Sequence, residues 1–222
     1  MATTKLKLYN GALLICGASA ISSLTVNEEK RHLLDLVWDD NGVRYCLSQA
    51  QWLFAMRSSQ FSYETDVEPA FGLRRAFEKP TDWVATSAVC SDPYFKAPLL
   101  QYADEVSHWY ADIDDIYVRY VSDDTDYGAD YSKWPETFTE YVKHYFAGKI
   151  IRKLPGGQDR VVELLGPSGR PDKGAVHAAL MTAKNRDAMK GPTQFPPRGT
   201  WSGARGTRSW VNDRGNPGSL TG

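Results

Sequence analysis

The chain has 222 residues, of which 42% are hydrophobic, 12% aromatic and 24% charged. This composition is typical of a soluble globular protein with room for one domain of good size and a real hydrophobic core. The formal net charge of −1 creates no global field that would select nucleic acid or an anionic membrane. No stretch approaches the roughly 20 apolar residues that are needed to span a bilayer, so no membrane partner is expected.

The three cysteines, Cys16, Cys46 and Cys90, are odd in number and widely spaced. They therefore indicate no disulfide framework. We expect them to be reduced core residues of a protein made in the cytoplasm.

Residues 5–24 combine two lysines, an apolar run and a small-residue Ala-Ser-Ala sequence, which is the layout of a secretory leader. The uninterrupted apolar run covers only residues 12–16, and a leader needs roughly 7–15 apolar residues. Four residues instead recur at helical spacing on one side: Leu6, Tyr9, Leu13 and Cys16. The pattern favours the first amphipathic helix of the fold over an export signal.

A second helix is predicted over residues 28–51. Asn27 can cap its start, and Glu28 and Glu29 suit the exposed amides and the positive dipole end of a first turn. Gly42 weakens the middle, but the apolar period continues through it. We therefore expect one helix that is kinked at most.

The period then changes, and a β-rich insertion is expected over about residues 53–131. Phe61 and Tyr63 alternate with polar neighbours, as they would in an extended strand. Pro80 ends this region, and a short helix is predicted after it over residues 83–90.

The clearest strand pattern of the chain follows this short helix. Acidic turns separate three apolar and aromatic segments whose side chains alternate between two faces. These segments predict a small antiparallel sheet, and they cover residues 99–103, 106–110 and 116–121.

Residues 122–133, SDDTDYGADYSK, are expected to form an acidic loop. Calcium binding is the alternative for this loop, but no register places acids, a glycine and a glutamate as an EF-hand requires.

Trp134-Pro135-Glu136 begins another helix, because proline is tolerated in a first turn. Its companion is predicted over residues 175–189, after the break GPSGRPDKG. Together these elements predict a mainly α chain of the α+β class, in which a helical bundle over residues 1–190 carries the small antiparallel sheet.

Residues 191–222 differ abruptly from the rest of the chain. About a third of them are glycine or proline, and they contain four arginines and one acid. Such a segment cannot bury enough apolar surface to offset its conformational entropy, yet three large aromatic residues are costly to leave in water. We expect an extended arm that orders against a partner through Phe195, Arg198, Trp201, Arg205, Arg208, Trp210 and Arg214.

Sequence motifs of catalytic and metal sites are missing. The histidines form no HxxxH or HExxH pair, and the cysteines form no CxxC. The GPSGRPDKG segment departs from a phosphate-binding loop, because Gly174 and not Ser or Thr follows Lys173. The closest match to a nucleophile elbow, residues 17–21, lacks the final glycine. We predict a protein that is not an enzyme and has no cofactor or metal.

The arm has two interpretations. Arginines among tryptophans can neutralise phosphates and stack on bases, which predicts a nucleic-acid-binding module with modest, salt-sensitive affinity. Arginine and tryptophan are also enriched at the energetic centres of protein interfaces. We favour a protein partner and keep nucleic acid as the alternative.

The order of several motifs resembles the tail tubular protein A family, the head-to-tail adaptor (connector) proteins of short-tailed bacteriophages. The resemblance covers about residues 5–154, and the GPSGRPDKG break and the arm depart from it. It rests on a first helix followed by a long helix that runs into a Trp-Phe-Ala strand, an aromatic strand and a WPxxF helix start. These stretches read NGALLICGASAISSLTVNEEKRHLLDLVWDDNGVRYCLSQAQWLFAM, FEKPTDWV, DDIYVRYVS and WPETFTEYVKHYFAGKI.

The resemblance implies a structural virion protein at the head–tail junction. Its partners would be the portal protein, the tail nozzle (tail tubular B-like) protein and further copies of itself in a ring that typically has twelve subunits. Genome DNA would pass through the ring without specific binding. Asp123, Asp124 and Asp126 are then candidates to line or rim the channel, where negative charge would prevent DNA from sticking, and the arm is the candidate clasp for the portal.

Overall fold

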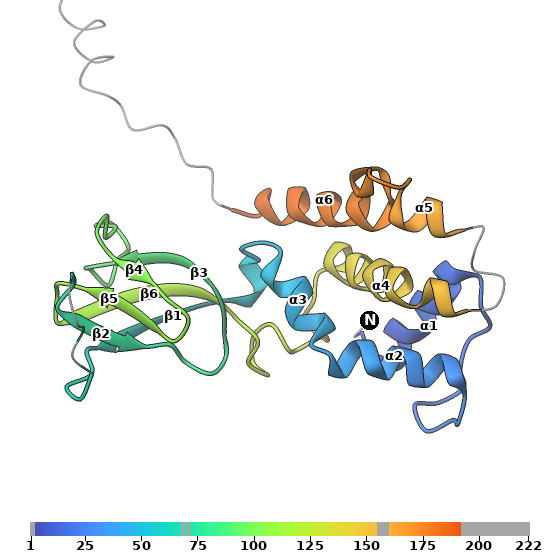
Figure 1. Ribbon diagram of the computed structural model, residues 1–222, viewed down its shortest axis with the longest axis horizontal. Helices are drawn as coiled ribbons and strands as arrows, with labels where there is room; N and C mark the ends of the chain where they lie inside the picture. Colours follow the sequence, from blue (N-terminus) through green and yellow to red (C-terminus); the bar gives the residue numbers. More distant parts are fainter. Residues whose placement is uncertain (1–2, 68, 70–71, 155–159, 192–222) are drawn as a thin grey trace, which may run out of the picture. The chain divides into compact units, whose positions relative to one another are not determined.

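The computed structural model describes residues 3–67, 69, 72–154 and 160–191, in which α-helices are combined with two small antiparallel sheets (Figure 1). This arrangement confirms the expected α+β class. The helical elements are α1 (Lys5–Cys16), α2 (Glu29–Asp39), α3 (Gly42–Ser48), η1 (Leu53–Ala55), α4 (Glu136–Ile150), η2 (Ile151–Lys153), α5 (Val161–Leu165), η4 (Pro171–Lys173) and α6 (Ala175–Ala188). The strands are β1 (Met56–Ser62), β2 (Arg75–Glu78), β3 (Trp83–Cys90), β4 (Ala103–Asp104), β5 (His108–Ala111) and β6 (Asp115–Ser122).

Helix α1 begins and ends where its sequence provides caps. Thr4 precedes the first turn, and its Oγ1 accepts a hydrogen bond from the Lys7 amide at 3.3 Å. At the other end Gly17 has a left-handed φ of 75°, and its amide donates to the Leu14 carbonyl at 2.9 Å. The helix predicted in this stretch is confirmed, and it buries Leu8, Tyr9, Ala12, Leu13 and Cys16.

The single helix predicted over residues 28–51 is wrong, because the chain forms α2 and α3 with a break between them. Asn41 has a left-handed φ of 57°, which a continuing right-handed helix excludes. The backbone of Gly42, which follows, lies close to that of Val37, since a Cβ on residue 42 would lie 2.5 Å from the carbonyl oxygen of Val37. The apolar period runs through the break because both short helices pack against the same core.

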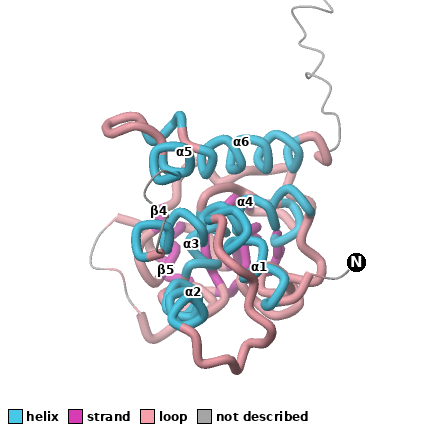
Figure 2. Tube along the Cα trace, turned by 90° about the vertical axis from the view of Figure 1, so that its right-hand side faces the viewer, coloured by secondary structure: helices cyan, strands magenta, loops and turns pink. Residues whose placement is uncertain are grey.

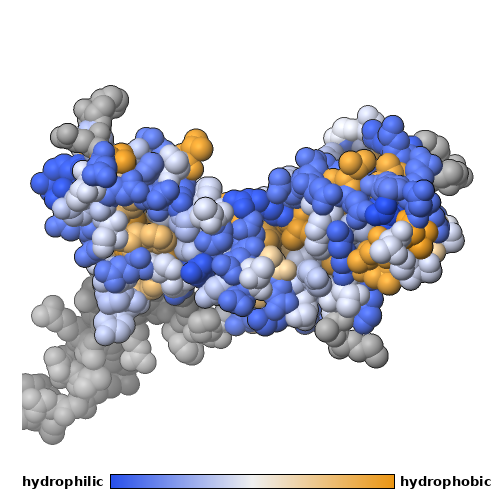
Figure 3. All heavy atoms as spheres, turned by 90° about the horizontal axis from the view of Figure 1, so that it is seen from below, coloured by the Kyte–Doolittle hydropathy of each residue, from blue (hydrophilic) through white to orange (hydrophobic). Residues whose placement is uncertain are grey.

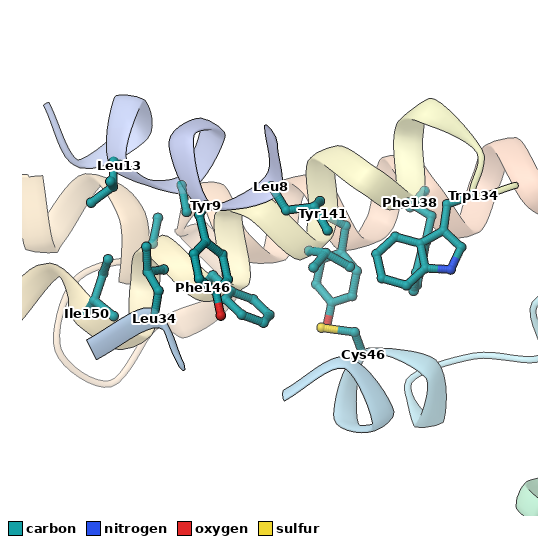
Figure 4. Packing of buried hydrophobic residues seen from close by; sticks show 14 of the residues in the cluster. Leu8, Tyr9, Leu13, Leu34, Cys46, Trp134, Phe138, Tyr141, Phe146 and Ile150 are labelled. Carbon is teal, nitrogen blue, oxygen red and sulfur yellow. The ribbon is translucent and has the colours of Figure 1, made fainter. Parts of the chain in front are cut away.

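Helix α4 is the centre of the helical part. It contacts α1, α2 and α3, and α5 and α6 form a layer on its other side (Figure 2). In Figure 4, side chains from α1 and α4 meet in the core, and the Tyr141 hydroxyl points towards Cys46 of α3. Phe138 lies among aromatic rings, and the nearest centroids are at 4.8 Å for Trp52, 4.8 Å for Phe54 and 5.0 Å for Trp134. The wide apolar stripe of α4 therefore organises the largest core of the described chain.

The helix predicted over residues 83–90 is also wrong, because these residues form β3. Strand β3 pairs antiparallel with β6 from Trp83–Ser122 to Cys90–Tyr117, with irregularities in the register. Strand β6 is the central strand of its sheet and pairs with β1 along one edge. Strand β3 pairs along the other edge of β6 and satisfies the amides and carbonyls there. The β-branched residues of this segment also pack better in a strand than in a helix.

The described chain forms two three-stranded sheets where one sheet was expected. The first has the order β1-β6-β3 and the second β2-β5-β4, and all pairs are antiparallel. The strand predicted over residues 99–103 shrinks to β4, and the strands predicted over 106–110 and 116–121 become β5 and β6 with shifted ends. The sheets share a second hydrophobic core made of Phe77, Val89, Trp109, Ala111, Ile116, Val118 and Tyr120.

Candidate interaction surfaces

The seven arm residues proposed to bind a partner lie outside the described residues: Phe195, Arg198, Trp201, Arg205, Arg208, Trp210 and Arg214. Residues Met1–Lys190 form one compact unit, and the arm belongs to a separate unit.

The three candidate channel acids differ in their surroundings. Arg44 of α3 donates a hydrogen bond to Asp123, and the Arg57 guanidinium lies 3.6 Å from a carboxylate oxygen of Asp124. Asp126 is exposed, and its amide donates to the Asp124 carboxylate at 3.0 Å. Burial raises the pKa of Asp123, although Arg44 acts in the opposite direction. Two of the three carboxylates are therefore partly neutralised by arginines, and Asp126 presents the most open charge.

Asp82 is a half-buried structural carboxylate that sequence reasoning missed. It accepts hydrogen bonds from Arg57 at 2.9 Å, from Ser122 at 2.5 Å and from the Tyr120 hydroxyl at 3.3 Å. Burial alone would raise its pKa, but the bonds from Ser122 and Arg57 outweigh burial and leave the pKa of Asp82 lowered. Asp82 thus ties the start of β3 to β1 and β6 as a charged group.

Charge is distributed unevenly along the chain. Residues 53–131, which contain every described strand, have fifteen Asp and Glu against six Lys and Arg. Residues 132–190, which contain α4, α5 and α6, have eleven Lys and Arg against six Asp and Glu. The net charge of −1 therefore hides an acidic β region and a basic helical region.

A pocket of about 580 Å³ opens between α3, α4, α5 and α6, and we call it the α3–α6 pocket. Its wall is aromatic where the Tyr45 and Tyr145 rings stack with centroids 5.0 Å apart. Lys149, Arg152 and His177 add its ionisable groups, and none of the described residues that line it is acidic. Burial raises the pKa of Tyr145, so its hydroxyl stays neutral. The pocket is apolar and basic at the same time.

The β4–β5 turn, residues 105–107, presents an apolar side chain to solvent. Val106 is 94% exposed, although a strand was predicted to begin at this residue. Buried Lys79 holds the turn, because its ammonium donates to Asp104 and to the carbonyl of Glu105. The same ammonium lies 3.7 Å from the centre of the Trp83 ring. The tertiary contacts of Lys79 therefore fix the conformation of this turn.

Other apolar residues are exposed on the helical part. Leu14 of α1 is 76% exposed and Leu36 of α2 is 66% exposed. Figure 3 shows hydrophobic residues, in orange, gathered over the helical end of the face seen from below. Nothing in the described part of the chain covers these leucines.

The described residues bring no three His, Cys, Asp or Glu side chains together as a metal site. No helix within the described ranges has both the length and the hydrophobicity to cross a membrane.

Comparison with known proteins finds no family model and no curated protein that matches the chain.

Proposed function

We propose that this chain is a structural, non-catalytic subunit of the head-to-tail adaptor of a short-tailed bacteriophage. Copies of the chain form a ring between the portal and the tail nozzle, and the ring surrounds the channel for the genome. The ordered motifs of residues 5–154 support this proposal, because they resemble the tail tubular protein A family.

The observation that carries the proposal is the separation of charge between the β region and the helical region. Identical subunits that close a ring meet through two different surfaces of the same chain. An acidic surface and a basic surface attract each other in that arrangement, whereas a symmetric dimer through either surface would bring like charges together. The charge pattern therefore favours head-to-tail association of copies.

The arm has the role of a portal clasp in this proposal. A Gly- and Pro-rich segment that orders only on contact keeps subunits apart until the portal offers a template. Its arginines and tryptophans are residue types that dominate binding energy in protein interfaces. The acids Asp123, Asp124 and Asp126 are placed at the channel rim, with Asp126 as the most exposed of them.

The experiment is a mixing assay with purified portal rings, read by electron microscopy and sedimentation. Full-length chain is expected to add a ring to the portal, and a variant without residues 191–222 is expected to fold but not to join. A full-length variant with Trp201→Ser and Trp210→Ser controls for arm length and should also join poorly. An unchanged yield of joined complexes with both variants would refute the clasp.

The alternative function is a nucleic-acid-binding module that uses the arm. The four arginines against one acid in residues 191–222 favour it. This function requires the chain to bind free DNA with an affinity that falls steeply as the salt concentration rises. The affinity should also be lost when residues 191–222 are removed. The adaptor function requires no such binding. Measuring the affinity for single-stranded and duplex DNA at several salt concentrations separates the two functions.

A further inference from the structure

The β4–β5 turn and the α3–α6 pocket complement each other. The turn presents exposed Val106 beside the exposed carboxylate Glu105, and the pocket combines an apolar, aromatic wall with Lys149 and Arg152. We propose that the β4–β5 turn of one copy docks into the α3–α6 pocket of a second copy. The inference rests on the proposed function in naming that second copy as the neighbour in the ring.

The turn is organised before any partner arrives. The Glu105 amide donates to the His108 carbonyl at 3.0 Å, and the Lys79 amide donates to the Ser107 carbonyl at 2.9 Å. The Lys79 ammonium, whose side chain is only 4% exposed, donates to the Glu105 carbonyl from within the core. A segment that is already held in one conformation loses little entropy on binding, so an exposed valine at its tip is an efficient anchor.

The pocket is suited to receive such an anchor. The stacked rings of Tyr45 and Tyr145 form a firm apolar wall, and Leu180 of α6 contributes aliphatic surface. Lys149 and Arg152 are both exposed, so they can reach a carboxylate beside the entering side chain. An apolar side chain in an aromatic pocket with charges at its rim is the arrangement found at energetic centres of protein interfaces.

A second copy fits the pocket better than the other occupants do. The arm has a net charge of +3, from four arginines and one aspartate, so the basic rim would repel it. The negative phosphates of DNA would be attracted to the basic rim, but DNA offers no aliphatic side chain for the apolar wall. The β region is acidic overall and provides both the carboxylate and the valine. The pocket lies among helices and the turn lies among strands, so the contact is head-to-tail (Figure 1).

The first test is disulfide cross-linking between two full-length variants, one with Val106→Cys and the other with His177→Cys. Cys16, Cys46 and Cys90 are buried, so the introduced thiols report the contact. The two variants carry tags of different mass and are oxidised mildly, both alone at high concentration and after mixing with portal rings. The control replaces His177→Cys by Val162→Cys, an exposed residue of α5 that does not line the pocket.

We expect the Val106→Cys and His177→Cys pair to cross-link at least about tenfold more than the control pair, because docking raises the effective concentration of the two thiols. No preference over the control, either alone or with portals, would overturn the contact. A cross-link from His177→Cys to a cysteine placed in the arm instead would overturn it in favour of the arm.

The second test reverses charges. Glu105→Lys or Lys149→Glu alone should each lower the cross-linking yield, and a mixture in which the Glu105→Lys turn meets the Lys149→Glu pocket should restore it. Asp66→Lys and Lys153→Glu are matched controls, because each makes the same charge change at an exposed residue outside both surfaces. Control variants that lower the cross-linking yield equally would overturn the proposal. Charge reversals that leave the cross-linking yield unchanged and abolish DNA binding would also overturn it.

The two proposals can fail separately. A specific cross-link between purified copies that never join a portal would keep the turn-to-pocket contact and contradict the adaptor function. Portal-bound rings in which the cysteine pair stays unlinked would keep the adaptor function and overturn the contact.

Discussion

Arg44 on α3 donates a hydrogen bond to Asp123, the residue that follows β6. The same guanidinium donates to the carbonyl of Trp83, where β3 begins. One arginine therefore attaches the helical part to the end of the β3–β6 strand pair at which β3 begins and β6 ends. Burial opposes this attachment, because it raises the pKa of Asp123 in spite of the ion pair.

Asp123→Asn is expected to change the free energy of unfolding by less than about 1 kcal/mol at pH 7. The amide can still accept from Arg44, and the cost of burying a charge is removed. Because the folded-state pKa of Asp123 is raised, its contribution to stability is present below the ordinary value of 3.8 and is lost as pH rises through the higher folded value. Urea unfolding at pH 7 measures the change, and a loss several times larger would contradict this balance.

Asp82→Asn is expected to cost about 2 kcal/mol, because Arg57 and Ser122 lose a charged acceptor. The pKa of Asp82 is lowered, so the stability that its charge contributes is present above the ordinary value of 3.8 and is lost as pH falls through the folded value. Urea unfolding at pH 7 and pH 3 should show a smaller difference between variant and parent at the lower pH. Asp126→Asn, at an exposed position, is the control and should be near neutral at both.

Phe138→Ala is expected to cost about 3–5 kcal/mol, because a ring that is 1% exposed and surrounded by aromatic side chains leaves a cavity. Leu36→Ala, at a side chain that is 66% exposed, should change stability by less than about 0.5 kcal/mol. Chemical denaturation compares the two variants. Equal effects would mean that α4 does not organise the core.

Asn41→Ala is expected to destabilise the chain by about 1 kcal/mol, because alanine tolerates the left-handed backbone between α2 and α3 poorly. Asn41→Gly should remain within about 0.5 kcal/mol of the parent, since glycine adopts this conformation freely. Thermal unfolding distinguishes the variants. If the Asn41→Ala variant were as stable as the Asn41→Gly variant, the left-handed backbone at residue 41 would not be needed for the fold.

The three native thiols are expected to resist maleimide at pH 7 in the folded chain. Burial raises the pKa of Cys46 to about 12 and of Cys16 to about 11, and it also raises the pKa of Cys90. Thiolate is the reactive form, so labelling should become fast only when denaturant unfolds the chain. Rapid labelling of the native protein at one equivalent or more would show that a thiol is accessible.

The helices that sequence analysis predicted correctly carry their signals locally. Thr4 and Gly17 cap α1, and the wide apolar stripe of α4 requires a core on that side. The segment at residues 83–90 has no such signal, and its strand conformation depends on pairing with β6, which lies elsewhere in the chain.

The candidate surfaces were harder to predict than the fold. Val106 becomes an exposed anchor only because Lys79 holds its turn from the core, and the pocket forms only where α3 and α6 meet α4. Both depend on contacts between residues far apart in sequence. The acidity of the β region, by contrast, can be counted from the sequence once the strands have been located.

Electron microscopy of the full-length chain, labelled and mixed with portal rings of the phage that encodes it, tests the central claim most directly. The account predicts labelled density in a closed ring on the tail-facing end of the portal, with neighbouring copies in head-to-tail contact. Labelled chain that stays monomeric, or that binds only DNA while the portal end remains bare, would contradict it.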